Sequence, residues 1–144
     1  MSPEIMGIII GVVIAVPTIY IARKSDCEDW VWPIFLVTLP LYYMVFGMLV
    51  MDGKAIFLEL LFGLPYIFIG LLVWKFKFSS ARILIAVAWL SHGFYDYYHD
   101  FLFVNSGVFS WYPAFCALID IIVGSYLLVN SWRPMHGFGK ASDA

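Results

Sequence analysis

Charged residues are scarce in this 144-residue chain: Lys, Arg, Asp and Glu make up 12% of it, whereas a soluble domain carries about 25%. Apolar residues make up 63%, so the chain lacks the polar surface that would cover a globule in water. The net charge of −2 is too small for an electrostatic footprint on nucleic acid. We therefore expect membrane lipid as a partner and no nucleic acid.

Cysteine and the common catalytic motifs are nearly absent as well. The two cysteines, Cys27 and Cys116, are too few for a disulfide framework. The sequence has no P-loop, no G-x-G-x-x-G, no G-x-S-x-G and no H-E-x-x-H motif. The N-terminal stretch MSPEIMGIII has an acid and no Lys or Arg before its apolar run, so we expect it to be retained and not cleaved as a secretory signal.

Long apolar runs are what the chain does have, and five of them reach the roughly 20 residues that a helix needs to cross a bilayer. Short polar breaks separate them. The expected spans are Pro3–Ala22, Trp30–Met51, Ala55–Trp74, Ala81–Phe101 and Pro113–Trp132. The predicted fold is an all-α, polytopic integral membrane bundle of five transmembrane helices, which forms a single domain over residues 1–144.

Basic residues fall almost entirely on one side of these spans. Lys54 is alone on the other side. The basic residues of the first side are Arg23, Lys24, Lys75, Lys77, Arg82, Arg133 and Lys140. Cytoplasmic loops carry an excess of Lys and Arg, so we expect the N-terminus outside and the C-terminus in the cytoplasm.

The first span contains the motif GIIIG, from Gly7 to Gly11. Glycines four residues apart allow a second helix to approach closely. We interpret the motif as packing within the bundle, with a dimer face as the alternative.

Polar side chains interrupt the fourth span in the stretch WLSHGFYDYYHDFLF, residues 89–103. His92, Asp96, His99 and Asp100 are spaced i, i+4, i+7 and i+8, which places them on one stripe of an α-helix. A charge in hydrocarbon costs about 2.5 kcal/mol or more, so we expect the stripe to face the bundle interior. An ordinary solvated helix end is the alternative for His99 and Asp100, which lie close to the outer interface.

Two other spans carry one acid each, Glu59 in the third and Asp120 in the fifth. Counting 1.5 Å per residue puts Glu59 about 8 Å and Asp120 up to about 13 Å below the outer interface. His92 lies roughly 12 Å deeper than Asp100. We therefore expect Glu59, His92, Asp96 and Asp120 to meet at a similar depth in the outer leaflet.

This set of side chains is the candidate functional site. The candidate catalytic residues are His92, Asp96 and Asp120, and the candidate metal ligands are His92, Asp96, His99, Glu59 and Asp120. A mixed nitrogen and oxygen ligand set suits a divalent metal such as zinc, iron or manganese. A metal-free acid/base or ligand pocket, and a polar core that only sets helix register, are the alternatives.

The stretches AWLSHGFYDYYHDF and FCALIDIIVG resemble an uncharacterised family of small bacterial integral membrane proteins that shares a WLxHxxxDxxH motif. The matching positions are Trp89, Leu90, His92, Asp96, His99, Cys116 and Asp120, with Glu59 a looser match. The family pattern often has a second histidine where this chain has Asp100. The resemblance implies a bacterial inner-membrane location and implies that the stripe and Asp120 belong together; it supplies no known activity.

The predicted function is that of a multi-pass membrane protein with a His/Asp/Glu site in the outer leaflet, which we expect to act as a metal-dependent or acid/base enzyme that modifies lipid. A hydrophobic small molecule would then reach the site sideways from the bilayer. The alternatives are a non-catalytic accessory subunit of a larger membrane complex and a small oligomeric transporter. The chain would accordingly be a homo-oligomer or a subunit of such a complex.

Overall fold

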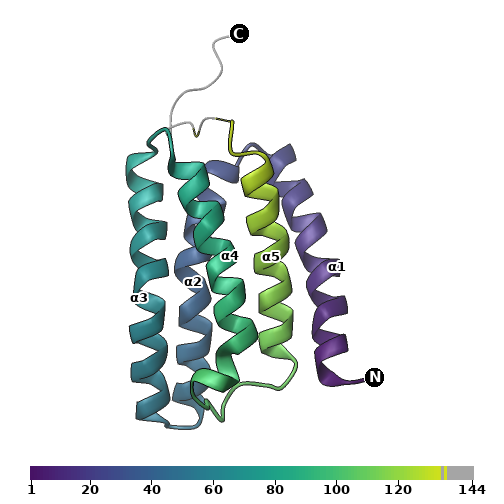
Figure 1. Ribbon diagram of the computed structural model, residues 1–144, viewed down its shortest axis with the longest axis vertical. Coiled ribbons are helices and arrows are strands. Elements are labelled where there is room, and N and C mark those ends of the chain that lie inside the picture. The colour runs from purple at the N-terminus through teal and green to yellow at the C-terminus, as the bar shows by residue number, and fades with distance from the viewer. Residues whose placement is uncertain (134, 136–144) are drawn as a thin grey trace.

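Five α-helices and no strands make up the part of the chain that the computed structural model describes, residues 1–133 and residue 135 (Figure 1). Each expected span is a helix, and most ends lie within three residues of the expected ones. Lys140, which entered the count of basic residues, lies outside the described residues. The helices are α1 (Pro3–Lys24), α2 (Glu28–Leu49), α3 (Gly53–Phe76), α4 (Ala81–Leu102) and α5 (Tyr112–Val129).

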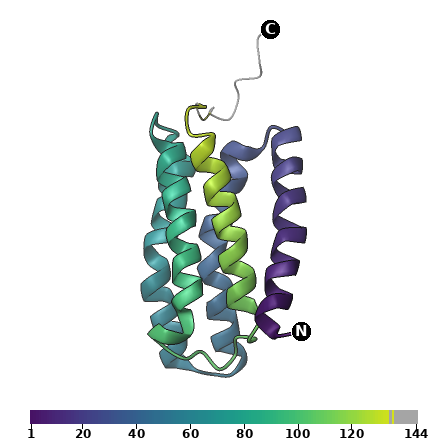
Figure 2. The ribbon, with the colours of Figure 1, turned by 45° about the vertical axis from the view of Figure 1, so that its right-hand side comes forward.

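The helices run alternately up and down along the long axis of the molecule, so that the start of α1 and the end of α5 lie at opposite ends (Figures 1 and 2). α2 packs mainly on α3, α4 packs mainly on α5, and α1 packs on the other side of α5. α4 also meets α3, whereas the described residues show no direct backbone packing of α3 on α5. α4 therefore stands between the two helices that carry the remaining acids.

Four of the helices, α1, α2, α3 and α5, are long and apolar enough to cross a membrane. Their outward faces carry large apolar side chains that no part of the described chain covers, such as Val13, Phe57 and Phe68, which are each more than 60% exposed. Such a surface is unfavourable in water and suits hydrocarbon. α4 has the same length as α1 and α2, but the polar stripe lowers its hydropathy.

The apolar core lies mainly in the half of the bundle away from His92, Asp96 and His99. Trp32 of α2 and Trp89 of α4 lie there edge to face, with ring centroids 6.0 Å apart, and the Trp89 indole N–H donates to the Trp32 carbonyl at 3.2 Å. Leu36 and Ile85 pack around them and are fully buried. This packing holds α4 against α2, and it sets the rotation of α4 that turns its polar stripe inward.

The two glycines of the GIIIG motif lie against α5, which agrees with packing within the bundle. A Cβ on Gly7 would lie 2.3 Å from the Trp111 carbonyl oxygen, and one on Gly11 would lie 3.1 Å from the Phe115 carbonyl oxygen. Both obstacles are backbone atoms, which a rotamer change cannot move. The close approach of α1 to α5 therefore requires glycine at position 7.

Replacing Gly7 with valine is expected to push α1 away from α5 and to destabilise the bundle by about 1–3 kcal/mol, the usual cost of overpacking. The measurement is the midpoint of unfolding of the detergent-solubilised protein. Gly53→Val is the matched control, because a Cβ at Gly53 meets no atom within 4 Å. Equal midpoints for the two variants would contradict the close contact.

Candidate metal centre and a neighbouring carboxylate network

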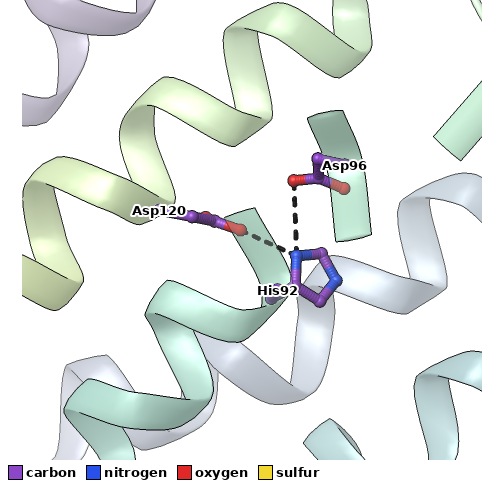
Figure 3. A group of neighbouring side chains, drawn as sticks. All are labelled: His92, Asp96 and Asp120. Carbon is purple, nitrogen blue, oxygen red and sulfur yellow. Dashed lines mark hydrogen bonds and ion pairs between the residues drawn. The ribbon is translucent and has the colours of Figure 1, made fainter. Parts of the chain in front are cut away.

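His92 lies between two aspartates, one on its own helix and one on the next (Figure 3). Its Nδ1 is 2.7 Å from an oxygen of Asp120 on α5 and 3.3 Å from an oxygen of Asp96, one turn further along α4. All three side chains are essentially fully buried, with at most 1% of each exposed. The i, i+4 spacing brings His92 and Asp96 together, and the packing of α4 on α5 adds Asp120.

Most of the polar atoms in this group have no hydrogen-bond partner among the described residues. They are both oxygens of Asp96, one oxygen of Asp120 and Nε2 of His92. A buried polar atom without a partner costs roughly 1–3 kcal/mol, and more when it is charged. Native proteins leave few such atoms, so a concentration of four at one place requires an explanation.

A bound cation would explain it. Ligand atoms of His92, Asp96 and Asp120 all lie within 4.8 Å of one another, a spacing that allows one ion to contact all three. Two carboxylates and a neutral imidazole carry a charge of −2, which a divalent ion neutralises. One nitrogen and two oxygen ligands also suit zinc, iron and manganese. These three residues can therefore hold a metal.

Glu59 and His99, which we expected in the same ligand set, form a second cluster closer to the end of the bundle. His99 Nε2 is 2.8 Å from one oxygen of Glu59, and the Tyr95 hydroxyl donates to the other at 2.8 Å. His99 Nδ1 is 3.0 Å from Asp100, whose side chain is 72% exposed. His99 itself is buried, so it does not belong to a solvated helix end.

The expectation that Glu59 would reach His92 is thus corrected, and helix length gives the reason. Glu59 lies six residues after the start of α3, about 9 Å from that end, while His92 lies ten residues before the end of α4, about 15 Å from it. His99 is about 4.5 Å from the end and is the histidine that the Glu59 side chain reaches. The ring of Tyr95 separates the clusters, at 5.6 Å from His92 and 5.7 Å from His99.

Two residues of the second cluster could not be identified from the sequence. Asn105 lies in the loop after α4, yet it is buried, and its Nδ2 donates to Glu59 at 2.9 Å and to the Tyr43 carbonyl at 3.0 Å. Tyr43 of α2 is buried and stacks on His99 with ring centroids 4.6 Å apart. A loop Asn and an interfacial Tyr are common in membrane proteins, so neither carried a signal.

Replacing Asn105 with alanine is expected to destabilise the protein by about 1–3 kcal/mol, because it leaves a Glu59 oxygen with one donor fewer in a buried site. The unfolding midpoint in detergent measures the loss. Asn130→Ala removes a single hydrogen bond to Tyr126 at the half-buried far end of α5 and serves as the control. A smaller loss for Asn105→Ala than for Asn130→Ala would rule out a structural role for this amide.

A pocket of about 510 Å³ opens on the side of the bundle between α1, α4 and α5. Its wall is mostly apolar, and it reaches Asp96 of the His92/Asp96/Asp120 group. The volume lies within the range of ligand pockets, about 300–1,000 Å³. The group thus lies next to this pocket, although the Asp96 carboxylate itself is buried.

The opposite end of the bundle holds an ion-pair network. Glu28 is 7% exposed; it accepts a hydrogen bond from Tyr126 and lies 3.4 Å from Arg133. Arg82, also buried, pairs with Asp29 at 2.6 Å. These pairs join the ends of α2, α4 and α5 and lie far from His92 and His99.

No family model, no curated protein and no solved structure matches this chain. The resemblance to a bacterial membrane family stays a prediction from the motif.

Proposed function

We propose that the chain is a metal-dependent membrane enzyme whose His92, Asp96 and Asp120 hold one divalent cation and whose substrate is an amphiphile that enters from the lipid. The observation that carries this proposal is the set of unpartnered buried atoms on these three residues. Among the described residues, the ion-pair partner of both carboxylates is His92 and not a Lys or Arg, so their charge has to be balanced by protons or by a metal.

The hydrogen bonding of the group favours the metal over protons. If only His92 is protonated, the group keeps one net negative charge in a low-dielectric interior, which is costly. A second proton, on one aspartate, would neutralise the group but would leave most of its carboxylate oxygens without a partner. A divalent ion with a neutral His92 and two carboxylates is neutral as a whole. It would also provide a partner for carboxylate oxygens that now have none.

The number of ligands supports a catalytic and not a structural ion. Structural zinc sites have four protein ligands, whereas catalytic sites have three and keep a position for water or substrate. The group offers three residues, one of which also lines the pocket. A substrate in the pocket would therefore lie beside the ion.

The proposed setting is the bacterial inner membrane. In this proposal α4 crosses the membrane as the other four helices do, the N-terminus lies outside and the C-terminus lies in the cytoplasm. The supports are the length of α4, which is the same as that of α1 and α2, and the clustering of basic residues at the end opposite Lys54. In this orientation both polar clusters lie in the outer leaflet.

Elemental analysis of the protein purified in detergent tests the proposal. We expect about one zinc, iron or manganese per chain, which dialysis against a chelator removes and a single equivalent of the ion restores. Protein that carries no divalent metal after purification, and takes up none from a metal buffer, would overturn the proposal in favour of a metal-free polar core.

A further inference from the structure

The pocket between α1, α4 and α5 carries acidic side chains outside the proposed metal site, and the metal does not account for them. Two exposed acids line the pocket, Glu4 and Asp100, and none of its described lining residues is basic. Asp96 also lines it, but its carboxylate is fully buried. Among the described residues neither oxygen of Asp96 has a hydrogen-bond partner, although one lies 3.3 Å from His92 Nδ1. An anionic molecule would meet only like charges there, whereas a cation would meet complementary ones.

The polar and apolar parts of the pocket lie at different depths. Glu4 is in the first turn of α1, and Asp100 is in the last turn of α4, one turn closer to the end of the bundle than Asp96. Ile8 and Ile121 line the pocket further from this end. The mouth is thus acidic and the floor apolar, with Asp96 between them.

We infer that the pocket binds an amphiphile with a cationic head group, such as a long-chain amine. The head group lies at the mouth beside Glu4 and Asp100, and the chain lies on the apolar floor. The part of the molecule between them then comes next to Asp96. This inference names the substrate class of the proposed metal enzyme and rests on that function.

Three photoreactive C12 probes with the same diazirine in the chain test the inference: dodecylamine, dodecanol and dodecyl phosphate. The protein is labelled in maltoside micelles, and labelled peptides of α4 and α5 are quantified by mass spectrometry. Two acids at the mouth attract the amine and repel the phosphate, so the amine should label these peptides roughly tenfold more than the phosphate. Dodecanol should lie between them.

Variants show whether the labelling comes from this pocket. Glu4→Gln and Asp100→Asn should each reduce labelling by the amine about threefold. Asp26→Asn, which removes an exposed acid at the opposite end of the bundle, should leave it unchanged. Ala114→Phe, in the pocket wall, should reduce labelling by all three probes, whereas Val129→Phe on the exposed far end of α5 should not.

Labelling by the phosphate or by dodecanol at the level of the amine would overturn the inference, as would amine labelling that Ala114→Phe leaves intact. The metal content of the same samples separates the two proposals. Metal-loaded protein without a preference for the amine refutes the substrate class alone. A preference for the amine in protein that never binds metal refutes the metal enzyme alone.

Discussion

His92→Ala is expected to abolish metal binding, with a loss of affinity of at least about 100-fold. Removing a residue that only orients a metal ligand typically costs 10–100-fold, and His92 would be a ligand itself. It is also the residue that contacts both aspartates, at 2.7 Å and 3.3 Å. Without it, two buried carboxylates on α4 and α5 face each other without the nitrogen ligand.

His99→Ala is a matched control for this variant, because both histidines are buried on α4 and each contacts a buried carboxylate. We expect it to retain the metal while losing the pair with Glu59. Metal content per chain, measured in parallel with the unfolding midpoint, distinguishes ligand loss from unfolding. Retention of metal by a folded His92→Ala protein, or equal metal loss in folded His99→Ala, would contradict the assignment of the ligands.

Trp89→Ala is expected to have the largest effect on stability, a loss of about 3–5 kcal/mol, as is typical when a buried tryptophan is truncated. Trp89 is 1% exposed, and it packs edge to face on Trp32 and donates to its carbonyl. Truncation removes the ring contact and the hydrogen bond and leaves a cavity between α2 and α4. Because this contact helps to set the rotation of α4, we also expect weaker metal binding in this variant.

Trp74→Ala provides the comparison, since that ring is 41% exposed and lies at the end of α3. Its midpoint of unfolding in detergent should change little, while that of Trp89→Ala falls markedly. Similar losses for both variants would show that burial of Trp89 contributes less than the structure implies.

The polar side chains of α4 belong to two clusters that differ in their hydrogen bonding. The Glu59 cluster contains several donors, from Tyr95, His99 and Asn105, and each Glu59 oxygen has a partner. In the His92 group the one donor is His92, and three of the four carboxylate oxygens have no hydrogen-bond partner among the described residues. Because of this contrast in hydrogen bonding, we assign the cation to the His92 group and a structural role to the Glu59 cluster.

The number and bounds of the helices, and a membrane environment for the protein, were predictable from the sequence alone. A helix satisfies its backbone hydrogen bonds internally, so a run of about 20 apolar residues in lipid specifies a helix whatever its neighbours are. The pairing of His92 with Asp96 was predictable for the same reason, since an i, i+4 spacing is a property of one helix. The place of the chain in a homo-oligomer or a larger complex stays a prediction.

Contacts between helices were decided by the tertiary structure. The sequence did not distinguish Asp120 from Glu59 as the partner of His92. In the structure α4 lies between their helices, so that Asp120 on α5 pairs with His92 and Glu59 on α3 pairs with His99. Asn105 joins the same cluster only because the loop after α4 folds back onto α2. Such partners depend on the order of the helices and on the relative depth of their side chains. Both are set by packing between helices, so they cannot be read from the hydropathy of a single helix.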